Sequence, residues 1–316
     1  MKNSQRVMVK IIEEICSEEG IQCECFSYDW IFRLTKNGKT AHIFGYQFEN
    51  NSATTQLICT DKCASSEILS SRGIPTVEHF FFISPDDLHY IGLEGNWPRM
   101  LELLQKFGRL VCKPNEGTGG IDVFQVSSAA ELELAVNSIF AHSRSLALSP
   151  FYPIDQEYRV ILLNEEVKLV FSKTIQSIIG NGRSSFRQLL LKQNPSLLES
   201  VPTGEFSEDL LNKIPKPGEK IPLNWKHNLG QGAQPEIITD ALLLPQLRDL
   251  ALRAAKAVNA RFASVDIIHT GGEYKVLEIN SGIMMENFAR LNLNNYQKAK
   301  SIYKEAICSL FNDKNN

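Results

Sequence analysis

The chain reads SVDIIHTGGEYKVLEIN over residues 264–280. Two very apolar segments, each interrupted by oxygen-bearing side chains, flank Gly271-Gly272, and this pattern is typical of a β-hairpin. Glu278 and Asn280 are two residues apart, so they share one face of their strand. If the loop holds three residues, Asp266 lies directly opposite Glu278 on that same face.

These three polar side chains predict a metal site. Two neighbouring carboxylates repel each other unless a cation lies between them. Carboxylate and amide oxygens, completed by water and phosphate, are the ligands that Mg²⁺ prefers, with Mn²⁺ as the alternative ion. We therefore expect Asp266, Glu278 and Asn280 to be metal ligands. The alternative is a set of polar residues on an exposed sheet face.

A second motif, VCKPNEGTGG, covers residues 111–120. Glycines let backbone N–H groups approach an anion closely, and Lys113 at the strand end adds a positive charge. The loop is not a Walker A loop, because no Gly-Lys-Ser/Thr follows and the next element is predicted to be a strand. It is either an ordinary hairpin turn with a surface lysine or a polyphosphate loop, whose binding residues are then Lys113, Gly117, Thr118, Gly119 and Gly120.

The third motif, SPFYPIDQEYR, covers residues 149–159. An apolar, aromatic crossing between two lobes can hold a purine, and domain junctions are frequent ligand sites. Ser149, Phe151 and Tyr152 are the candidates for this contact. Glu157, at the start of the next strand, can accept hydrogen bonds from ribose hydroxyls. The alternative is a plain linker.

The rest of the chain predicts an α+β fold. In the first half we expect helices at 5–18, 61–71 and from 84 onward, and strands at 22–28, 30–35, 40–46, 109–113 and 121–126. Ser128 and Glu131 form a capping box for a further helix. In the second half we expect strands at 157–163, 167–172, 262–268 and 274–279, and helices at 239–258 and 294–311. The segment 196–232, rich in Pro, Gly, Asn and Lys, is long for an idle loop and is expected to lie over a site.

Composition excludes several classes of protein. A chain of 316 residues with 43% hydrophobic residues can bury a sizeable core. A net charge of -3 without a Lys/Arg-rich run argues against a nucleic-acid partner. No apolar stretch approaches the ~20 residues that span a bilayer, so we expect no membrane partner and a cytoplasmic location. The seven cysteines include no CxxC pair and are interpreted as reduced thiols rather than a zinc site.

In this order and spacing, the three motifs resemble the ATP-grasp superfamily, from about residue 61 to the C-terminus. Asp61-Lys62, followed ten residues later by RGIPT (72–76), is similar to the first phosphate-contacting lysine of that family and the helix behind it. Lys113 matches the second lysine, and Glu157 matches the acidic residue that contacts the ribose. Asp266, Glu278 and Asn280 match the metal-ligand trio.

Within the superfamily, the chain is most similar to cyanophycin synthetases and to the ATP-grasp part of bifunctional glutathione synthetases, which are RimK-like. The shared segments are EYRV (157–160), Lys173 followed by IGNGR (179–183), and NLGQG (228–232). The segment 281–288 lacks the proline that those relatives carry after the metal-binding Asn, and the sequence assigns no acceptor site to it.

The resemblance implies an ATP-grasp fold in which two α+β subdomains, 76–152 and 153–316, clasp a nucleotide after a small N-terminal lobe, 1–75. It implies an ATP-dependent ligase that joins a carboxylic acid to an amine through an acyl phosphate, with ATP and Mg²⁺ required. Lys173 and Arg183 are the candidates for stabilising the oxyanion or holding the substrate carboxylate, with solvated surface charge as the alternative. Lys226, His227 and Asn228 are expected to belong to the cover of the site.

Three other functions remain open at this point. The enzyme could modify a peptide or protein, act as a small-molecule kinase, or be a non-catalytic ATP-binding regulator. The apolar run 80–83 is either a core strand, which we expect, or the contact of a homodimer.

Overall fold

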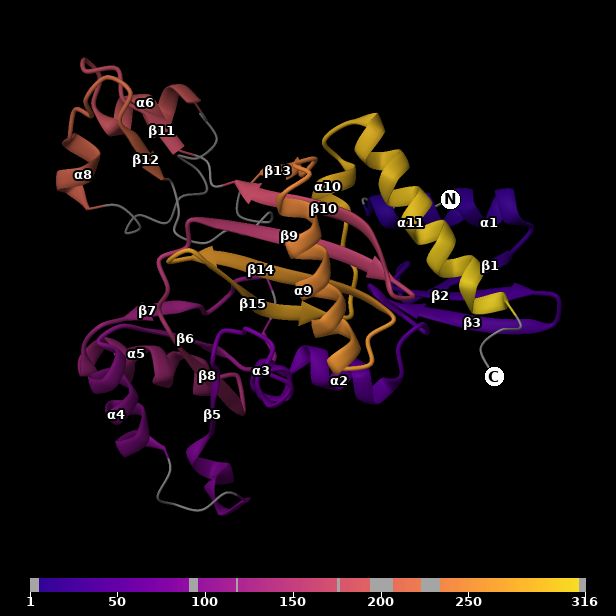
Figure 1. Cartoon of the computed structure of the whole chain (residues 1–316), viewed down its shortest axis with the longest axis horizontal. Coiled ribbons are helices and arrows are strands. Elements are labelled where there is room, and N and C mark those ends of the chain that lie inside the picture. Colours follow the sequence, from indigo (N-terminus) through magenta and orange to yellow (C-terminus); the bar gives the residue numbers. More distant parts are fainter. Residues whose placement is uncertain are drawn as a thin grey trace. The chain divides into compact units, whose positions relative to one another are not determined.

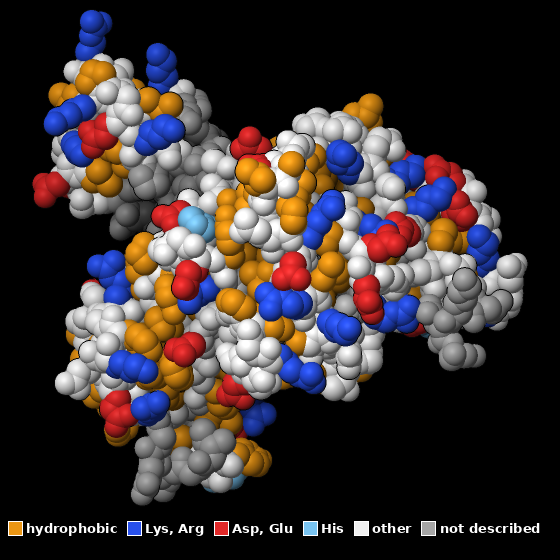
Figure 2. Space-filling view, in the orientation of Figure 1, with side chains coloured by type: hydrophobic (Ala, Val, Ile, Leu, Met, Phe, Trp, Pro, Cys, Tyr) orange, Lys and Arg blue, Asp and Glu red, His pale blue; other side chains and the backbone are white. Residues whose placement is uncertain are grey.

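The computed structural model describes residues 6–90, 96–117, 119–174, 177–193, 207–222 and 234–312. The chain forms two compact units, residues 1–172 with 236–316 and residues 173–235. Within the first unit, Figure 1 shows how helices cover the sheets. None of the helices in the described part of the chain is both long and apolar enough to cross a membrane. On the face drawn in Figure 2, the described basic and acidic side chains are interspersed.

The N-terminal lobe is a small antiparallel sheet covered by two helices. The sheet has the order β1-β2-β3-β4 and consists of β1 (Gln22–Phe26), β2 (Ile31–Lys36), β3 (Lys39–Phe44) and β4 (Gln47–Phe48). Inward-pointing residues such as Phe32, Leu34 and Ile43 alternate with more exposed ones. Helices α1 (Val7–Glu19) and α11 (Leu293–Phe311) pack together and against this sheet, so the two ends of the chain share one core (Figure 1).

The central sheet has the order β13-β10-β9-β14-β15. Its strands are β9 (Gln156–Leu163), β10 (Glu166–Thr174), β13 (Gln234–Ile237), β14 (Phe262–Thr270) and β15 (Glu273–Asn280). The helices α2 (Ala53–Thr60), α3 (Lys62–Ser71) and α9 (Leu243–Ala257) pack against it, and α9 lies across its strands in Figure 1. Nearly every residue of β14 is buried, which explains its almost continuous apolar sequence.

A third sheet, of order β5-β8-β6-β7, completes the first unit. Its strands are β5 (Phe80–Ile83), β8 (Ser145–Pro150), β6 (Leu110–Pro114) and β7 (Phe124–Val126). The short 3-10 helix η1 (Pro85–Tyr90) follows β5, and the helices α4 (Trp97–Phe107) and α5 (Ala129–Phe140) pack on the sheet. The predicted capping box of α5 is present, with Ser128 and Glu131 in their expected roles.

The second unit is small. It contains the antiparallel pair β11 (Ser177–Ile179) and β12 (Lys220–Pro222) with the helices α6 (Phe186–Gln193) and α8 (Glu208–Asn212). Its own core gathers Ile178, Phe186, Leu190 and Ile221. Part of the predicted cover, 196–232, falls here, but residues 194–206 and 223–233 lie outside the described residues, and with them Lys226, His227 and Asn228.

Most of the elements expected from the sequence are found, with different ends. The strand expected at 121–126 is only Phe124–Val126, because Asp122 has a left-handed backbone with a φ of 53°. The helix expected from 84 is a single 3-10 segment. The run 80–83 is a strand whose Phe82 is buried, whereas Phe81 is 39% exposed. Helices α2 and α4 and strand β8 were not predicted.

Helix α1 obtains its N-terminal cap from a distant part of the chain. Arg6 makes no side-chain cap, and the first turn of α1 contains no acid. Instead, the buried carboxylate of Glu286, on α10 (Glu286–Ala289), accepts hydrogen bonds from the backbone N–H groups of Val7 at 2.8 Å and Met8 at 3.1 Å. An anion at this end of a helix is favoured by the dipole and by the unpaired N–H groups.

Replacing Glu286 by Ala should destabilise the protein by about 1–3 kcal/mol, because the buried N–H of Met8 and the partly buried N–H of Val7 lose their acceptor. Glu286→Gln should lose less, since one acceptor oxygen remains. Urea unfolding followed by circular dichroism measures the difference. Glu13→Ala, at an exposed position of the same helix, is the control and should change the free energy of unfolding by less than about 0.5 kcal/mol. Equal midpoints for Glu286→Ala and the wild type would contradict the assigned cap.

Candidate active site

Three polar side chains form a row across the central sheet. Asp266 on β14 pairs in register with Glu278 on β15 and, on its other side, with Arg159 on β9. Directly paired residues of antiparallel strands project from the same face. The predicted placement of Asp266 opposite Glu278 is therefore confirmed.

The reasoning behind this placement was wrong in one detail. Thr270 pairs with Glu273, so the hairpin loop holds two residues, Gly271-Gly272, and not three. A β-bulge restores the register, because Ile267 pairs with Val276 while Asp266 pairs with Glu278, which leaves one extra residue, Leu277. Without this bulge, Leu277 would lie opposite Asp266.

Arg159 balances the charge of Asp266. Its Nε and one terminal nitrogen donate to the two carboxylate oxygens at 2.7 and 2.6 Å. The side chains are 17% and 1% exposed. Burial opposes the charged guanidinium, but the attraction and hydrogen bonds of Asp266 outweigh it and raise the pKa of Arg159. A bidentate pair of this kind fixes the orientation of both groups.

Arg159 was not among the predicted site residues. The available signal was its position two residues after Glu157, which places both side chains on one face of β9. Its partner lies 107 positions away, and the spacing of residues in the sequence does not reveal such a pairing.

The predicted metal ligands form a donor set that suits a hard divalent cation. Glu278 and Asn280 are half-buried neighbours, and Asn280 Nδ2 donates to Glu278 Oε1 at 3.2 Å, which leaves the Asn280 amide oxygen as an acceptor. Asp266 contributes two more carboxylate oxygens. Oxygen donors of this composition suit Mg²⁺. Their role as metal ligands stays a prediction.

Lys62 holds the glycine loop. It is the first residue of α3, whose N-terminus is capped by Asp61, and it is only 9% exposed. Its Nζ donates to the carbonyl oxygens of Asn115 at 3.1 Å and Gly117 at 2.6 Å. Burial lowers the pKa of Lys62, and the negative charge of Glu278 works in the opposite direction. Two of its three N–H donors are thus occupied by the loop.

Lys113 is a buried cation of a different kind. It lies on β6 and is 7% exposed, and within the described ranges no hydrogen-bond or ion-pair acceptor lies beside its Nζ. Burial first, and then the charge of Lys62, lower its pKa to about 8, while Glu278 and Glu157 work in the opposite direction. The charges of Lys62, Lys113 and Glu278 therefore act on one another. An anion bound here would relieve the cost of two buried ammonium groups.

The loop after Lys113 allows a close backbone approach at several positions. Gly119 and Gly120 both have a φ of +72°, which L side chains rarely adopt, and a Cβ at Gly117 would lie 3.0 Å from the Pro114 Cβ. Thr118 lies outside the described residues. This geometry agrees with a phosphate loop, and the role of these glycines stays a prediction.

The segment between β8 and β9 links the third sheet to the central sheet. Ser149 is buried on β8, and the Phe151 N–H donates to the carbonyl of Arg109, whose guanidinium lies 5.1 Å from the Phe151 ring centre. Lys275 Nζ lies 5.6 Å from the Tyr152 ring centre. The prediction described this segment as a crossing between two lobes, and that division stays a prediction. Its contact with a purine and the ribose contact of buried Glu157 also stay predictions.

Lys173 and Arg183 belong to the second unit. Lys173 is buried near the end of β10, and Arg183 is exposed in a turn where its N–H donates to Asn181 Oδ1 at 2.9 Å. Their assignment to catalysis stays a prediction.

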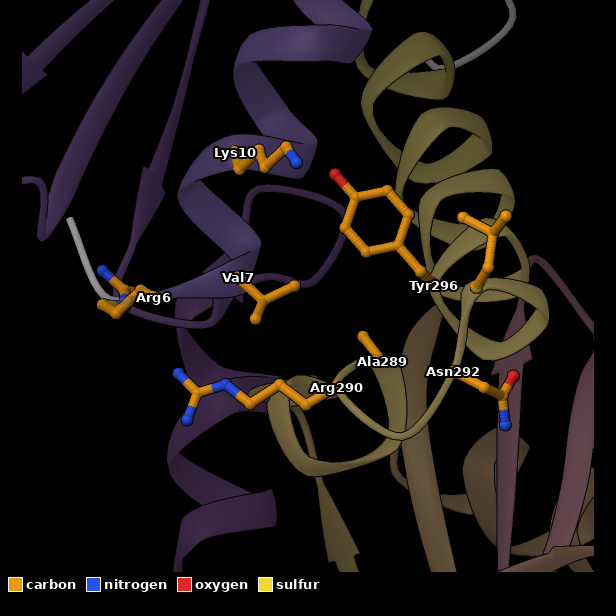
Figure 3. Close-up of a pocket in the computed structure, with 8 residues that line it drawn as sticks. Arg6, Val7, Lys10, Ala289, Arg290, Asn292 and Tyr296 are labelled. Atoms are coloured by element: carbon orange, nitrogen blue, oxygen red, sulfur yellow. The ribbon is translucent and has the colours of Figure 1, made fainter. Parts of the chain in front are cut away.

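A separate pocket lies where the N-terminal lobe meets the segment after β15 (Figure 3). Its volume is about 500 Å³, and its lining includes Arg6, Lys10, Arg290 and Tyr296. The Arg6 guanidinium donates to the Asp29 carbonyl at 2.7 Å and to the Gly45 carbonyl at 3.0 Å. Arg290 lies 3.3 Å from Glu286, so much of the positive charge around this pocket already has partners.

Comparison with known proteins identifies the fold. Residues 220–301 match the RimK-like ATP-grasp domain family. The chain is 31% identical over 205 residues to the glutathione biosynthesis bifunctional protein GshAB of Clostridium perfringens, covering 58% of this chain and 26% of that protein. It is 26% identical over 255 residues to the cyanophycin synthetase of Trichormus variabilis, covering 74% of this chain and 26% of that protein.

A crystal structure of a bifunctional glutathione synthetase from Pasteurella multocida has the same fold. It superposes with a TM-score of 0.53 at 16% identity, over 94% of this chain and 44% of that chain. The protein spans only 26% of the length of the two curated relatives named above. The chain thus contains a RimK-like ATP-grasp domain that is distantly homologous to these enzymes, and the predicted ATP-grasp fold is confirmed.

Nucleotide affinity should depend on the charge of Lys113. Below about pH 8 its ammonium is already charged in the free protein, whereas at higher pH binding of a polyphosphate must take up a proton. The Kd for Mg-ATP should therefore be flat near pH 7 and rise above pH 8, by up to about tenfold per pH unit. Isothermal titration calorimetry between pH 6.5 and 9.5 measures it.

Lys113→Arg should bind more weakly but lose this pH dependence, because arginine stays charged throughout the range. Lys106→Arg, at an exposed position of α4, should retain the profile of the wild type. If the Kd of Lys113→Arg for Mg-ATP rose above pH 8 as steeply as that of the wild type, the pH dependence could not be assigned to Lys113.

Proposed function

We propose that this protein is an ATP-dependent carboxylate–amine ligase that forms an amide through an acyl phosphate and releases ADP and phosphate. The observation that carries the proposal is the pair of buried lysines beside the carboxylate row. Lys62 and Lys113 lie within electrostatic reach of Glu278, and Lys113 has no acceptor beside it within the described part of the chain. Cations next to acidic metal ligands suit a metal-bound polyphosphate better than a free carboxylate.

Each group of residues has a distinct task in this reaction. Lys62 and Lys113 offset the charge that spreads over the phosphoryl oxygens when the substrate carboxylate attacks the γ-phosphate. Glu157 accepts hydrogen bonds from the ribose hydroxyls. Asp266, Glu278 and Asn280 would hold Mg²⁺, which when bound supplies Lewis-acid stabilisation of the phosphate oxygens.

Arg159 orients the Asp266 carboxylate through two hydrogen bonds. A carboxylate oxygen has two lone pairs, so one hydrogen bond from Arg159 to each Asp266 oxygen does not by itself exclude a metal. The acyl phosphate then meets the amine, whose attack creates a tetrahedral oxyanion that needs a nearby cation. Lys173 and Arg183 are the proposed sources of that cation or of the contact with the substrate carboxylate.

The acid and the amine remain to be identified. The named relatives include a protein of glutathione biosynthesis and a cyanophycin synthetase, so amino acids and short peptides are the first compounds to test. The chain contains only part of the length of those proteins, and its substrates are therefore proposed as a class, a carboxylic acid and an amine.

Glu278→Gln should lower ligase turnover by about a hundredfold or more, because a carboxylate ligand of the metal becomes a neutral amide. The measurement is release of ADP and phosphate from Mg-ATP with pools of amino acids, dipeptides and other carboxylates, with and without added amines. Glu273→Gln is the matched control, since it lies on the same strand but is exposed.

The ligase would be supported if release of ADP and phosphate requires both an acid and an amine. This release should be lost in Glu278→Gln but not in Glu273→Gln. Release with the acid alone, yielding a stable phosphorylated product, would indicate a kinase. Tight Mg-ATP binding without turnover in any pool, peptides included, would indicate a regulator. Failure of the wild type to bind Mg-ATP would refute the proposal.

A further inference from the structure

His79 is a buried imidazole close to α3, the helix that begins with Lys62. Its Nδ1 lies 3.0 Å from the Val77 carbonyl, which also accepts from Ser66, one helical turn after Lys62. His79 lies between α3 and β5 and is 5% exposed. The preceding residues run beside β15, the strand that carries Glu278, since the Val77 N–H donates to the Val276 carbonyl at 2.9 Å. His79 therefore belongs to the wall of the candidate site, although no motif in the sequence marked it.

Its hydrogen bonding defines which ring nitrogen carries the proton. Nδ1 lies 3.0 Å from the Val77 carbonyl oxygen, which can only accept, so Nδ1 is the donor. The Ser66 hydroxyl donates to the same carbonyl at 2.8 Å and holds it in place. In the neutral ring, Nε2 then presents a lone pair. This atom is buried without a hydrogen-bond partner in the described part of the chain.

The surroundings keep the ring neutral. Burial, followed by the positive charges of Lys113 and Lys62, holds the pKa of His79 well below its usual value. A neutral Nε2 can accept a hydrogen bond but cannot donate one. Phosphate oxygens are also acceptors, so Nε2 does not suit direct contact with a polyphosphate. The hydrogen-bond partner that suits Nε2 in this site is therefore an N–H donor.

Lys113 is the donor that needs such an acceptor. Lys62 already donates twice to the glycine loop, whereas Lys113 Nζ has three donors and no acceptor beside it among the described residues. Lys113 pairs with Ala147, and Ala147 pairs with Phe81. Lys113 therefore projects from the same face of the third sheet as Phe81, two residues after His79. A hydrogen bond between the Nε2 lone pair and the Lys113 ammonium would satisfy both groups.

We propose that His79 is a positioning residue for nucleotide binding. Its Nε2 accepts one hydrogen bond from the Lys113 ammonium and thereby directs the remaining two donors toward the phosphates. This inference rests on the proposed function only in requiring that the site binds a nucleotide. It adds a residue whose role is to orient a charge and not to contact the ligand.

Two substitutions of His79 distinguish the role of Nδ1 from that of Nε2. In His79→Asn, the amide nitrogen replaces Nδ1 and keeps the hydrogen bond to Val77, but no atom replaces Nε2. In His79→Gln, the amide oxygen reaches the position of Nε2 and restores an acceptor. His142→Asn is the control, because His142 is 51% exposed and pairs with Asp122.

Calorimetry at pH 7 should show the Kd for Mg-ATP raised about tenfold in His79→Asn, within about threefold of the wild type in His79→Gln, and unchanged in His142→Asn. In the absence of nucleotide, His79→Asn and His79→Gln should unfold with the same midpoint temperature. Wild-type affinity in His79→Asn would overturn the inference. Equal weakening in the Asn and Gln variants, in parallel with equal loss of stability, would assign His79 a purely structural role and also overturn it.

A measurement on the wild-type protein covers the case in which a variant does not fold. With ¹⁵N-labelled histidine, the Nε2 resonance of His79 should show an unprotonated nitrogen between pH 6 and 8 and should shift when Mg-ATP saturates the protein. An unchanged Nε2 resonance at saturation would overturn the inference. Nucleotide binding without ligase turnover would refute the proposed ligase, while the affinity ratio of the His79 variants would still decide this inference.

Discussion

The cost of burying charge is the constraint on which the rest of the site depends. Arg159, Lys62 and Lys113 each place a cation in the interior, where an unpaired charge costs several kcal/mol. The three are balanced to different degrees. Arg159 has a bidentate carboxylate partner and Lys62 has two backbone carbonyls. Among the described residues, Lys113 has no hydrogen-bond acceptor and is attracted at longer range by negative charges such as those of Glu278 and Glu157. The least balanced cation is the one whose environment most favours an incoming anion. In the proposed function, the electrostatic cost in the free protein would be recovered when a polyphosphate binds.

The strand register of the central sheet places the opposite charges of Arg159 and Asp266 next to each other, which lowers the cost of burying them. Arg159, Asp266 and Glu278 come from three neighbouring strands, and a shift of one residue in either pairing would move a charge to the opposite face. The two-residue turn alone would produce the wrong pairing, and the bulge at Leu277 corrects it. Turn and bulge therefore act together to place the two carboxylates side by side.

Local patterns in the sequence predicted the elements and the polar residues but not their long-range partners. The hairpin at 264–280 and the capping box of α5 were found because hydrophobic alternation and capping act over a few residues. The opposition of Asp266 and Glu278 was predicted correctly from a wrong loop length, since a bulge leaves no mark in a single sequence. His79 and Arg159 were missed because their roles depend on residues brought close by folding. Helix α4 was missed although Pro98 in its first turn and the C-cap Gly108 mark its two ends. Strand β8 was also missed.

The segment after Asn280 has a structural task that accounts for its unusual sequence. The Ile283 N–H donates to the Tyr46 carbonyl at 3.0 Å, and Tyr303 on α11 binds both Ile283 and Met285 through its hydroxyl. Glu286 then caps α1. These contacts join the N-terminal lobe to the strand that carries the predicted metal ligands, within six residues of Asn280. The Glu286 carboxylate accepts from the Val7 and Met8 N–H groups, from the Tyr46 hydroxyl and from Arg290, so its oxygens are already engaged by neighbouring groups of the protein. Under the proposed function, we therefore expect other side chains to recognise the substrates. The N-terminal lobe holds the end of β15 through these contacts.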